Sequence, residues 1–282
     1  MRRAVVALVL LAGLAACSSD PSVVDSSPTT TTAVAGATST TGPATTTTGR
    51  GATSTTAARA GTAPTSAPPA ARALGAPGAD APLYLRPAPA RALRIQVLAQ
   101  ADAAPQQSTL DALRAVLHDV SGKPVTVVET SLAAGTSAWT DASIARAAAG
   151  RAPQVAADTA LLQVLYVSGS YGGDESVLGI TVNAGVAAVF SHAVAAASNG
   201  LASPSRIERA VSTHELGHLL GLVDLYLHTG RADPQHPGHS TNPRSVMYWA
   251  VESDVIGDLL SGGPPTDFDS ADRSDLASIR GG

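Results

Sequence analysis

From about residue 82 onward, short apolar segments alternate with amphipathic ones. Residues 94–99, 124–129 and 161–167 are largely apolar or β-branched, which predicts buried strands. Between them, residues 108–122 carry leucine and valine at helical spacing after a capping-box-like start, and residues 140–150 form a shorter Ala-rich segment behind a capping threonine. This β-α-β-α-β order predicts a mixed α/β fold with a mostly parallel, twisted sheet and helices packed on it.

The next apolar segments predict the border of a cleft. Residues 177–182 and 186–190 follow a Gly-rich loop and are both strand candidates. One of them could be an edge strand, although the pattern does not decide which, and a free edge could hold an extended peptide as an added strand. Ser203 and Pro204 then open a long helix, as its N-cap and its first helical residue.

The N-terminus is typical of a targeting segment. Residues 1–16 combine two arginines, a short apolar run and small residues, which predicts a signal peptide. Leu14-Ala-Ala-Cys17 resembles a bacterial lipobox, so we expect Cys17 to carry lipid and anchor the chain outside the cytoplasm, at the bacterial cell membrane. The alternative is an ordinary signal peptide that contains a cysteine. Cys17 is the only cysteine, so the chain has no intramolecular disulfide.

Composition predicts a tether between this anchor and one folded domain. Residues 17–81 are mainly Ser, Thr, Ala, Gly and Pro and offer few large apolar side chains to bury. We expect a flexible spacer there, glycosylated or not, and a single catalytic domain over residues 82–282. The net charge is −4 and no basic stripe is present, so we expect no nucleic-acid partner. We also expect the protein to be a monomer.

Candidate chemistry is concentrated in the long helix. His214 and His218 are four residues apart, so both rings project from one face and could share a zinc ion. Glu215 is placed to take a proton from water and pass it to a leaving amine. Gly221 could end the helix and turn the chain, which would bring Asp224 back as the third ligand.

This segment resembles the extended H-E-x-x-H-x-x-G-x-x-(H/D) signature of the metzincin zinc endopeptidases. Ser245-Val-Met-Tyr248 is similar to their Met-turn, which would place Met247 beneath the metal. An aspartate as third ligand is similar to the snapalysin-like branch, and tyrosine directly after the methionine is similar to the matrixin-like turn. Trp249 stands where astacins and serralysins have tyrosine, so no tyrosine ligand is expected.

The resemblance implies a zincin-type fold with an edge strand over the cleft, an active-site helix, a Met-turn and a last helix over residues 267–279. It also implies one zinc ion held by His214, His218 and Asp224, Glu215 as general base, and polypeptide substrates outside the cell. Met247 would shape the floor of the site without taking part in the chemistry. The latency cysteine of matrixins has no counterpart here.

Other interpretations stay open. Glu252 is a candidate third ligand if the site resembles that of the gluzincins. His228, His236 and His239 could bind a second metal, although a solvated loop is the simpler interpretation, and we expect His192 to be structural. No calcium loop is recognisable in the Asp-rich tail. The chain could also be a surface-anchored binding or adhesion module with a structural zinc, in which a further side chain such as His228 would close the site.

Overall fold

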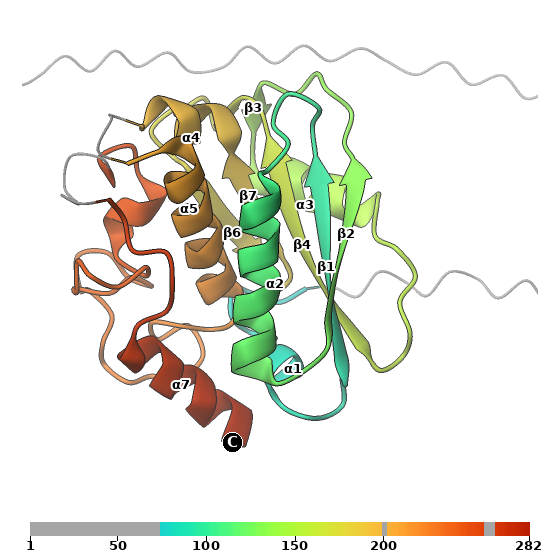
Figure 1. Ribbon diagram of the computed structural model, residues 1–282, viewed down its shortest axis with the longest axis vertical. Coiled ribbons are helices and arrows are strands. Elements are labelled where there is room, and N and C mark those ends of the chain that lie inside the picture. Colours follow the sequence, from blue (N-terminus) through green and yellow to red (C-terminus); the bar gives the residue numbers. More distant parts are fainter. Residues whose placement is uncertain (1–73, 199–201, 257–262) are drawn as a thin grey trace, which may run out of the picture. The chain divides into compact units, whose positions relative to one another are not determined.

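The computed structural model describes residues 74–198, 202–256 and 263–282 (Figure 1). Its main sheet has the strand order β2-β1-β4-β7-β6. The four strands from β2 to β7 are parallel and β6 is antiparallel to β7, which confirms a mixed α/β fold with a mostly parallel sheet. The strands are β1 (Ala92–Ala99), β2 (Val125–Ser131), β4 (Thr159–Val167), β6 (Gly179–Asn183) and β7 (Val186–Phe190).

The helices cover both faces of this sheet. Helix α2 (Gln107–Ser121) connects β1 to β2, and α3 (Asp141–Ala149) connects β2 back past β1 to β4. Because right-handed crossovers in opposite directions leave a sheet on opposite faces, α2 and α3 lie on different sides. Helix α5 (Pro204–Leu219) packs beside α2 (Figure 1).

Strand β4 shows the two faces directly. Gln163 donates from Nε2 to the carbonyl of Ala148 in α3, at 2.8 Å. Three residues later, the hydroxyl of Tyr166 lies 2.9 Å from Ser212 Oγ in α5. An odd spacing along a strand reverses the side-chain direction, so α3 and α5 are on opposite faces.

Helix ends follow the sequence signals in part. Thr140 caps α3 through a reciprocal capping box with Ser143, and Ser203 caps α5 by accepting from the Arg206 amide. Helix α2 instead starts after Gln106, whose backbone amide donates to Glu208 Oε1 at 2.9 Å. The capping signal expected at Ser108 is therefore not used, because a carboxylate of the neighbouring helix takes its place.

Short elements complete the domain. They are α1 (Ala81–Leu85), α4 (Ser191–Ala196), the 3₁₀ helix η1 (Trp249–Glu252), and a two-stranded pairing of β3 (Ala138–Trp139) with β5 (Ser170–Tyr171). Helix α7 (Ser270–Gly281) forms where the last helix was expected. Residues ahead of position 82 also contact the domain, since the carbonyl of Gly75 accepts from the Ala184 amide at 2.9 Å.

Three of the N-terminal predictions lie outside the described residues. These are the signal peptide 1–16, the lipidated Cys17 and the tether up to residue 73. Over the ranges that are described, no helix is long and apolar enough to cross a membrane.

Candidate metal centre

Helix α5 presents two imidazoles to one point. His214 and His218 are both buried, and their Nε2 atoms lie 2.9 Å apart. The rings are 4.6 Å apart and nearly perpendicular. Two ring nitrogens this close, one helical turn apart, are arranged as two ligands of one ion.

The backbone fixes the orientation of His214. Its Nδ1 lies 2.7 Å from the carbonyl oxygen of Val246, which can only accept, so Nδ1 carries the proton. Nε2 then keeps its lone pair and points to His218. Burial, followed by the charge of His214, holds the pKa of His218 well below its usual range, so this ring is neutral as well. A neutral imidazole held by a backbone carbonyl, as His214 is, is suited to bind a metal ion.

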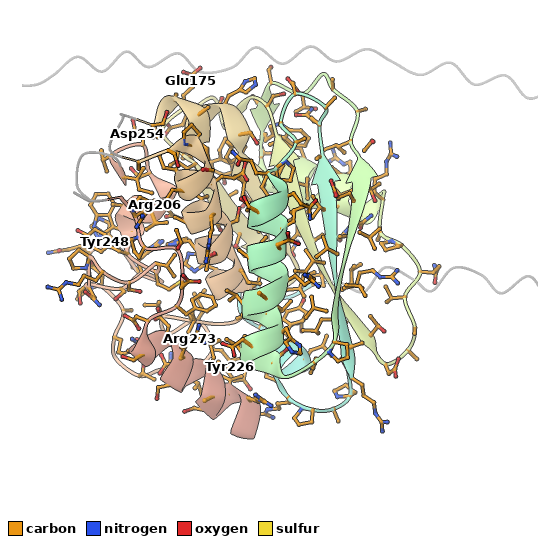
Figure 2. All side chains as sticks on the ribbon, in the orientation of Figure 1. Glu175, Arg206, Tyr226, Tyr248, Asp254 and Arg273 are labelled. Carbon is orange, nitrogen blue, oxygen red and sulfur yellow. The ribbon has the colours of Figure 1, made fainter. Side chains whose placement is uncertain are left out.

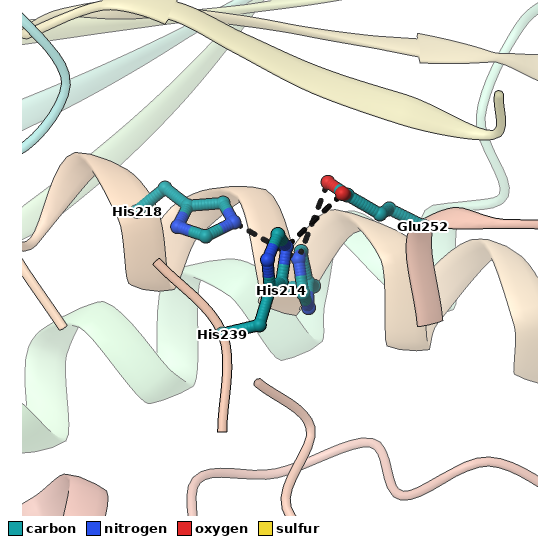
Figure 3. A group of neighbouring side chains, drawn as sticks. All are labelled: His214, His218, His239 and Glu252. Atoms are coloured by element: carbon teal, nitrogen blue, oxygen red, sulfur yellow. Dashed lines mark hydrogen bonds and ion pairs between the residues drawn. The ribbon is translucent and has the colours of Figure 1, made fainter. Parts of the chain in front are cut away.

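His239 provides a third imidazole from the loop after α5. Its ring stacks on His214 at 5.2 Å and 20° and meets His218 edge-on at 5.1 Å and 90°. Together with Glu252, the three histidines place one ligand atom each within 4.8 Å of one another (Figure 3).

The donor set fits zinc. At the zinc–nitrogen distances seen in proteins, tetrahedral ligand atoms lie about 3.3 Å apart, which is the scale of this cluster. The Nε2 of His239 is also buried and makes no well-aligned hydrogen bond with the described residues, although Glu252 Oε1 lies 3.0 Å away. Burial acts to lower the pKa of His239, but the nearby carboxylate of Glu252 outweighs it and raises the pKa. A metal ion at this ring would take the place of a proton.

Backbone pairing delivers His239 to the cluster. The amide of Ser240 donates to the carbonyl of Met247 at 2.8 Å, and the Asp233 amide donates to the carbonyl of His239 at 2.7 Å. Ser240 therefore ties the histidine loop to the segment that also holds Val246, the partner of His214. Both contacts place His239 through the main chain, which leaves its ring free to face the metal position.

The structure does not group Asp224, the predicted third ligand, with His214 and His218. Its Oδ1 accepts from the amide and the hydroxyl of Thr229, at 2.8 and 2.9 Å, and its Oδ2 lies 3.4 Å from the Ala232 amide. Burial acts to raise the pKa of Asp224, but these donors outweigh it and lower the pKa below its ordinary value. The physical reason is local: Asp224 has a left-handed φ of 66°, and its carboxylate organises the loop that carries His239.

Glu215 lies next to the first ligand and is buried. Its Oε2 accepts from the Thr181 hydroxyl at 2.7 Å, whereas Oε1 has no partner among the described residues. A Cβ at Gly179 would lie 2.5 Å from Oε1, so the carboxyl packs directly against the main chain of β6. Burial, then the charge of Glu252, raises the pKa of Glu215 well above its ordinary value, despite the hydrogen bond from Thr181. A carboxyl with a raised pKa holds a proton more tightly than an exposed one, which suits a group that accepts a proton and then returns it.

Met247 packs against the metal-binding helix. It is fully buried, and a side chain at Gly217 would collide with its Sδ and with Phe268. Its amide donates to Ser245 Oγ at 3.0 Å, and Ser245 donates to Asp272 of α7 at 3.0 Å. Met247 thus packs the hydrogen-bonded turn against the helix that carries both histidines.

The remaining histidines lie outside the cluster. His236 stacks on Trp249 at 4.5 Å and 10°, and its Nδ1 lies 3.0 Å from Asp233 Oδ2. His228 is exposed. His192, which we expect to be structural, is also exposed, and its Nε2 lies 3.9 Å from Asp102 Oδ2.

Glu252 comes from η1, which packs against α5. Its Oε2 lies 3.5 Å from His214 Nε2 and its Oε1 lies 3.0 Å from His239 Nε2. Burial acts to raise the pKa of Glu252, but the hydrogen bonds and charges of the two histidines outweigh it and hold the pKa well below its usual range. The carboxylate is therefore ionised beside three imidazoles.

The cluster opens on a cleft of about 510 Å³. His239 and Glu252 belong both to the cluster and to the cleft wall. One side of the cleft is formed by Tyr171, Ser176, Val177, Gly179 and Ile180, and the other by His236, Pro237, His239, Trp249, Glu252 and Ser253. Strand β6, the terminal strand of the main sheet, therefore borders the cleft and is the edge strand that the sequence left undecided.

Comparison with known proteins gives a limited result. No protein-family model matches this chain, and neither does any curated protein. Among solved structures, archaemetzincin from Methanopyrus kandleri is similar with a TM-score of 0.45 and 18% identity, over 67% of this chain and 96% of that one. Archaemetzincin from Archaeoglobus fulgidus, complexed with malonate, has a TM-score of 0.38 and 16% identity, over 66% of this chain and 99% of that one. A zinc-dependent peptidase from Methanocorpusculum labreanum has a TM-score of 0.38 and 19% identity, over 64% of this chain and 99% of that one. The function proposed below rests on the side chains of the site itself.

Proposed function

We propose that this protein is a zinc-dependent endopeptidase. The observation that carries the proposal is the convergence of His214, His218 and His239 at the wall of a cleft, with the buried Glu215 beside the first of them. Zinc, when bound, would supply a Lewis acid that polarises a carbonyl group and makes water more acidic. Three histidines are a ligand set of the catalytic type, in which one position stays available.

The chain's own residues would carry the proton. Glu215 would take a proton from water and return it to the leaving amine, because burial raises its pKa and makes it a stronger base than an exposed carboxylate. Thr181 holds the carboxyl in place through Oε2, so that Oε1 remains available. Gly179 allows this close approach, since any side chain there would push Oε1 aside.

The edge strand would hold the substrate. Gly179 and Ile180 of β6 line the cleft, and β6 is the last strand in the described part of the sheet. An extended peptide could add to this edge by main-chain hydrogen bonds, with little dependence on its sequence. That binding mode favours a polypeptide substrate over a small molecule.

The proposed site of action is outside the cytoplasm. The signal-like residues 1–16 and the lipobox-like sequence before Cys17 support a lipid anchor at the bacterial cell membrane. The Ser/Thr-rich residues that follow would hold the catalytic domain away from the membrane surface. Mass spectrometry of the N-terminus of membrane-purified protein tests this, and an unmodified Cys17 would contradict it.

A second candidate function is a surface binding module with a structural zinc. The observation in its favour is Glu252, which could close the ligand set with a fourth side chain. Glu215 argues against it, because a structural site has no need of a second, unbound carboxyl at the metal.

Cleavage of a fluorogenic peptide library by the zinc-loaded chain tests the proposal. We expect turnover that a strong chelator abolishes and added zinc restores. Glu215→Gln should keep its zinc and lose activity by about 10²- to 10⁴-fold, the usual contribution of general acid–base catalysis. Full activity in this variant, or activity that resists the chelator, would contradict the mechanism.

A further inference from the structure

We propose that Glu252 is a fourth protein ligand of the metal, and that it closes the site in the resting protein. This inference rests on the proposed zinc site and concerns the position that a catalytic site leaves open to water. Glu252 faces His214 and His239 together (Figure 3).

The carboxylate is directed into the cluster. Oε1 and Oε2 each approach a different imidazole Nε2, at 3.0 and 3.5 Å. The Nε2 of His214 is free to face the metal, since His214 uses Nδ1 for the Val246 carbonyl. His239 contributes a ligand atom to the same cluster. A metal ion bound between these two rings would therefore also be within reach of the carboxylate.

The backbone around Glu252 is hydrogen-bonded to the residues just ahead of β6. The carbonyl of Glu252 accepts from the Leu178 amide at 2.8 Å, and the Asp254 amide donates to the carbonyl of Ser176 at 2.9 Å. Between these bonds, Val177 and Ser253 form an antiparallel bridge. Residues 252–254 therefore pair with the chain just ahead of β6 and occupy one end of the edge that an extended substrate would use.

The main chain of this segment is fixed on both sides. Ala250, Val251 and Ile256 are fully buried, so a movement of the whole segment would expose apolar core. The side chain of Glu252 is different, because it is 30% exposed and lines the cleft. Rotation of this side chain alone would uncover the metal position while the cleft wall stays in place.

This arrangement predicts a specific role for Glu252. The resting protein would hold zinc with three imidazoles and one carboxylate, and would admit water only when the carboxylate moves away. A peptide that pairs with β6 and offers its carbonyl to the metal competes with Glu252 directly. The chain thus restrains its own activity without a separate inhibitory segment.

The test compares Glu252→Gln with the wild-type chain and with Asp254→Asn. The control removes one negative charge two residues away, from an exposed side chain on the same segment (Figure 2). Zinc affinity is measured by chelator competition, and the ligand set by the visible absorption of the Co²⁺-loaded proteins. Thermal unfolding confirms that each variant is folded.

We expect Glu252→Gln to bind zinc at least about tenfold more weakly, since even outer-shell partners of a metal contribute this much. Its Co²⁺ spectrum should change, and peptide turnover per bound zinc should rise, whereas Asp254→Asn should match the wild type. An unchanged affinity and spectrum in Glu252→Gln would overturn the inference and leave the proposed enzyme intact. A changed spectrum with no peptide cleavage in either protein would support the ligand and contradict the peptidase.

Discussion

The imidazole of His239 stacks 5.2 Å from that of His214, although one ring comes from an irregular loop and the other from α5. The loop is held by main-chain hydrogen bonds from Ser240 and to the carbonyl of His239. The helix ring is held by the Val246 carbonyl. One short segment of chain, from Val246 to Met247, therefore positions both histidines.

Gly179→Ala should damage catalysis without removing the metal. The new Cβ would meet Glu215 Oε1 at 2.5 Å and Val211 Cγ1 at 2.7 Å, so the carboxyl has to move. Because a misplacement of about 1 Å can cost about 100-fold in rate, we expect kcat to fall by one to two orders of magnitude. Zinc content, measured on the same sample, should remain at the wild-type level. Wild-type kcat in Gly179→Ala would show that Glu215 is not held by this contact.

Gly217→Ala should destabilise the domain. A Cβ at this position collides with the Sδ of Met247 and lies 3.1 Å from the Phe268 ring, in the fully packed space beneath α5. Overpacking of this kind costs about 1 to 3 kcal/mol in the free energy of unfolding. Gly281→Ala is the matched control, because Gly281 is also in a helix but has open space around it, and its effect should stay within about 0.5 kcal/mol. Urea unfolding of the two variants measures the difference, and equal stabilities would contradict the packing of Met247 against Gly217.

The stability of the domain should rise with pH between about 8 and 10. Burial, then the nearby charge of Arg280, lowers the pKa of Lys123 to about 8. In this window the unfolded chain binds a proton on this lysine and the folded chain does not, so the free energy of unfolding increases with pH. Lys123→Met removes the group and should flatten the slope measured by denaturant unfolding at several pH values. A slope that survives in Lys123→Met would assign it to another group.

The sequence pattern was sufficient for the regular parts of this molecule. Strands β1, β2, β4, β6 and β7 and helices α2, α3, α5 and α7 lie close to where the sequence predicts them, although α2 does not use the capping signal at Ser108. Periodicity works here because each of these elements buries one face, which the order of apolar residues records. His214 and His218 follow in the same way, since helix geometry alone brings residues four apart together.

The third histidine could not be found in this manner. His239 lies in a Pro- and Gly-rich loop, where no repeating geometry relates sequence distance to spatial distance. Motif spacing favoured Asp224, because a turn after Gly221 could return it to the metal. The structure instead uses the hydrogen-bonding capacity of Asp224 for Thr229 and Ala232. One signal in the sequence is the group of three histidines in this loop, which the sequence offers as ligands of a second metal.

The position of Glu252 beside the histidines could not be predicted from the sequence either. Its approach to His214 and His239 depends on the pairing of residues 252–254 with residues 176–178, a long-range contact between short irregular segments. No local pattern predicts such a pairing, because neither segment has enough residues for a period. The sequence offered Asp224 and Glu252 as alternative third ligands, and the structure groups Glu252, not Asp224, with the three histidines.

Zinc analysis of two matched variants tests the central claim most directly. The full chain, its His239→Ala variant and its Asp224→Asn variant are purified in parallel, checked for folding by circular dichroism, and assayed for bound zinc by mass spectrometry of the metal. We predict one zinc per chain in the wild type and in Asp224→Asn, and loss of zinc in His239→Ala. Zinc retained in a folded His239→Ala and lost in a folded Asp224→Asn would contradict the metal centre described here.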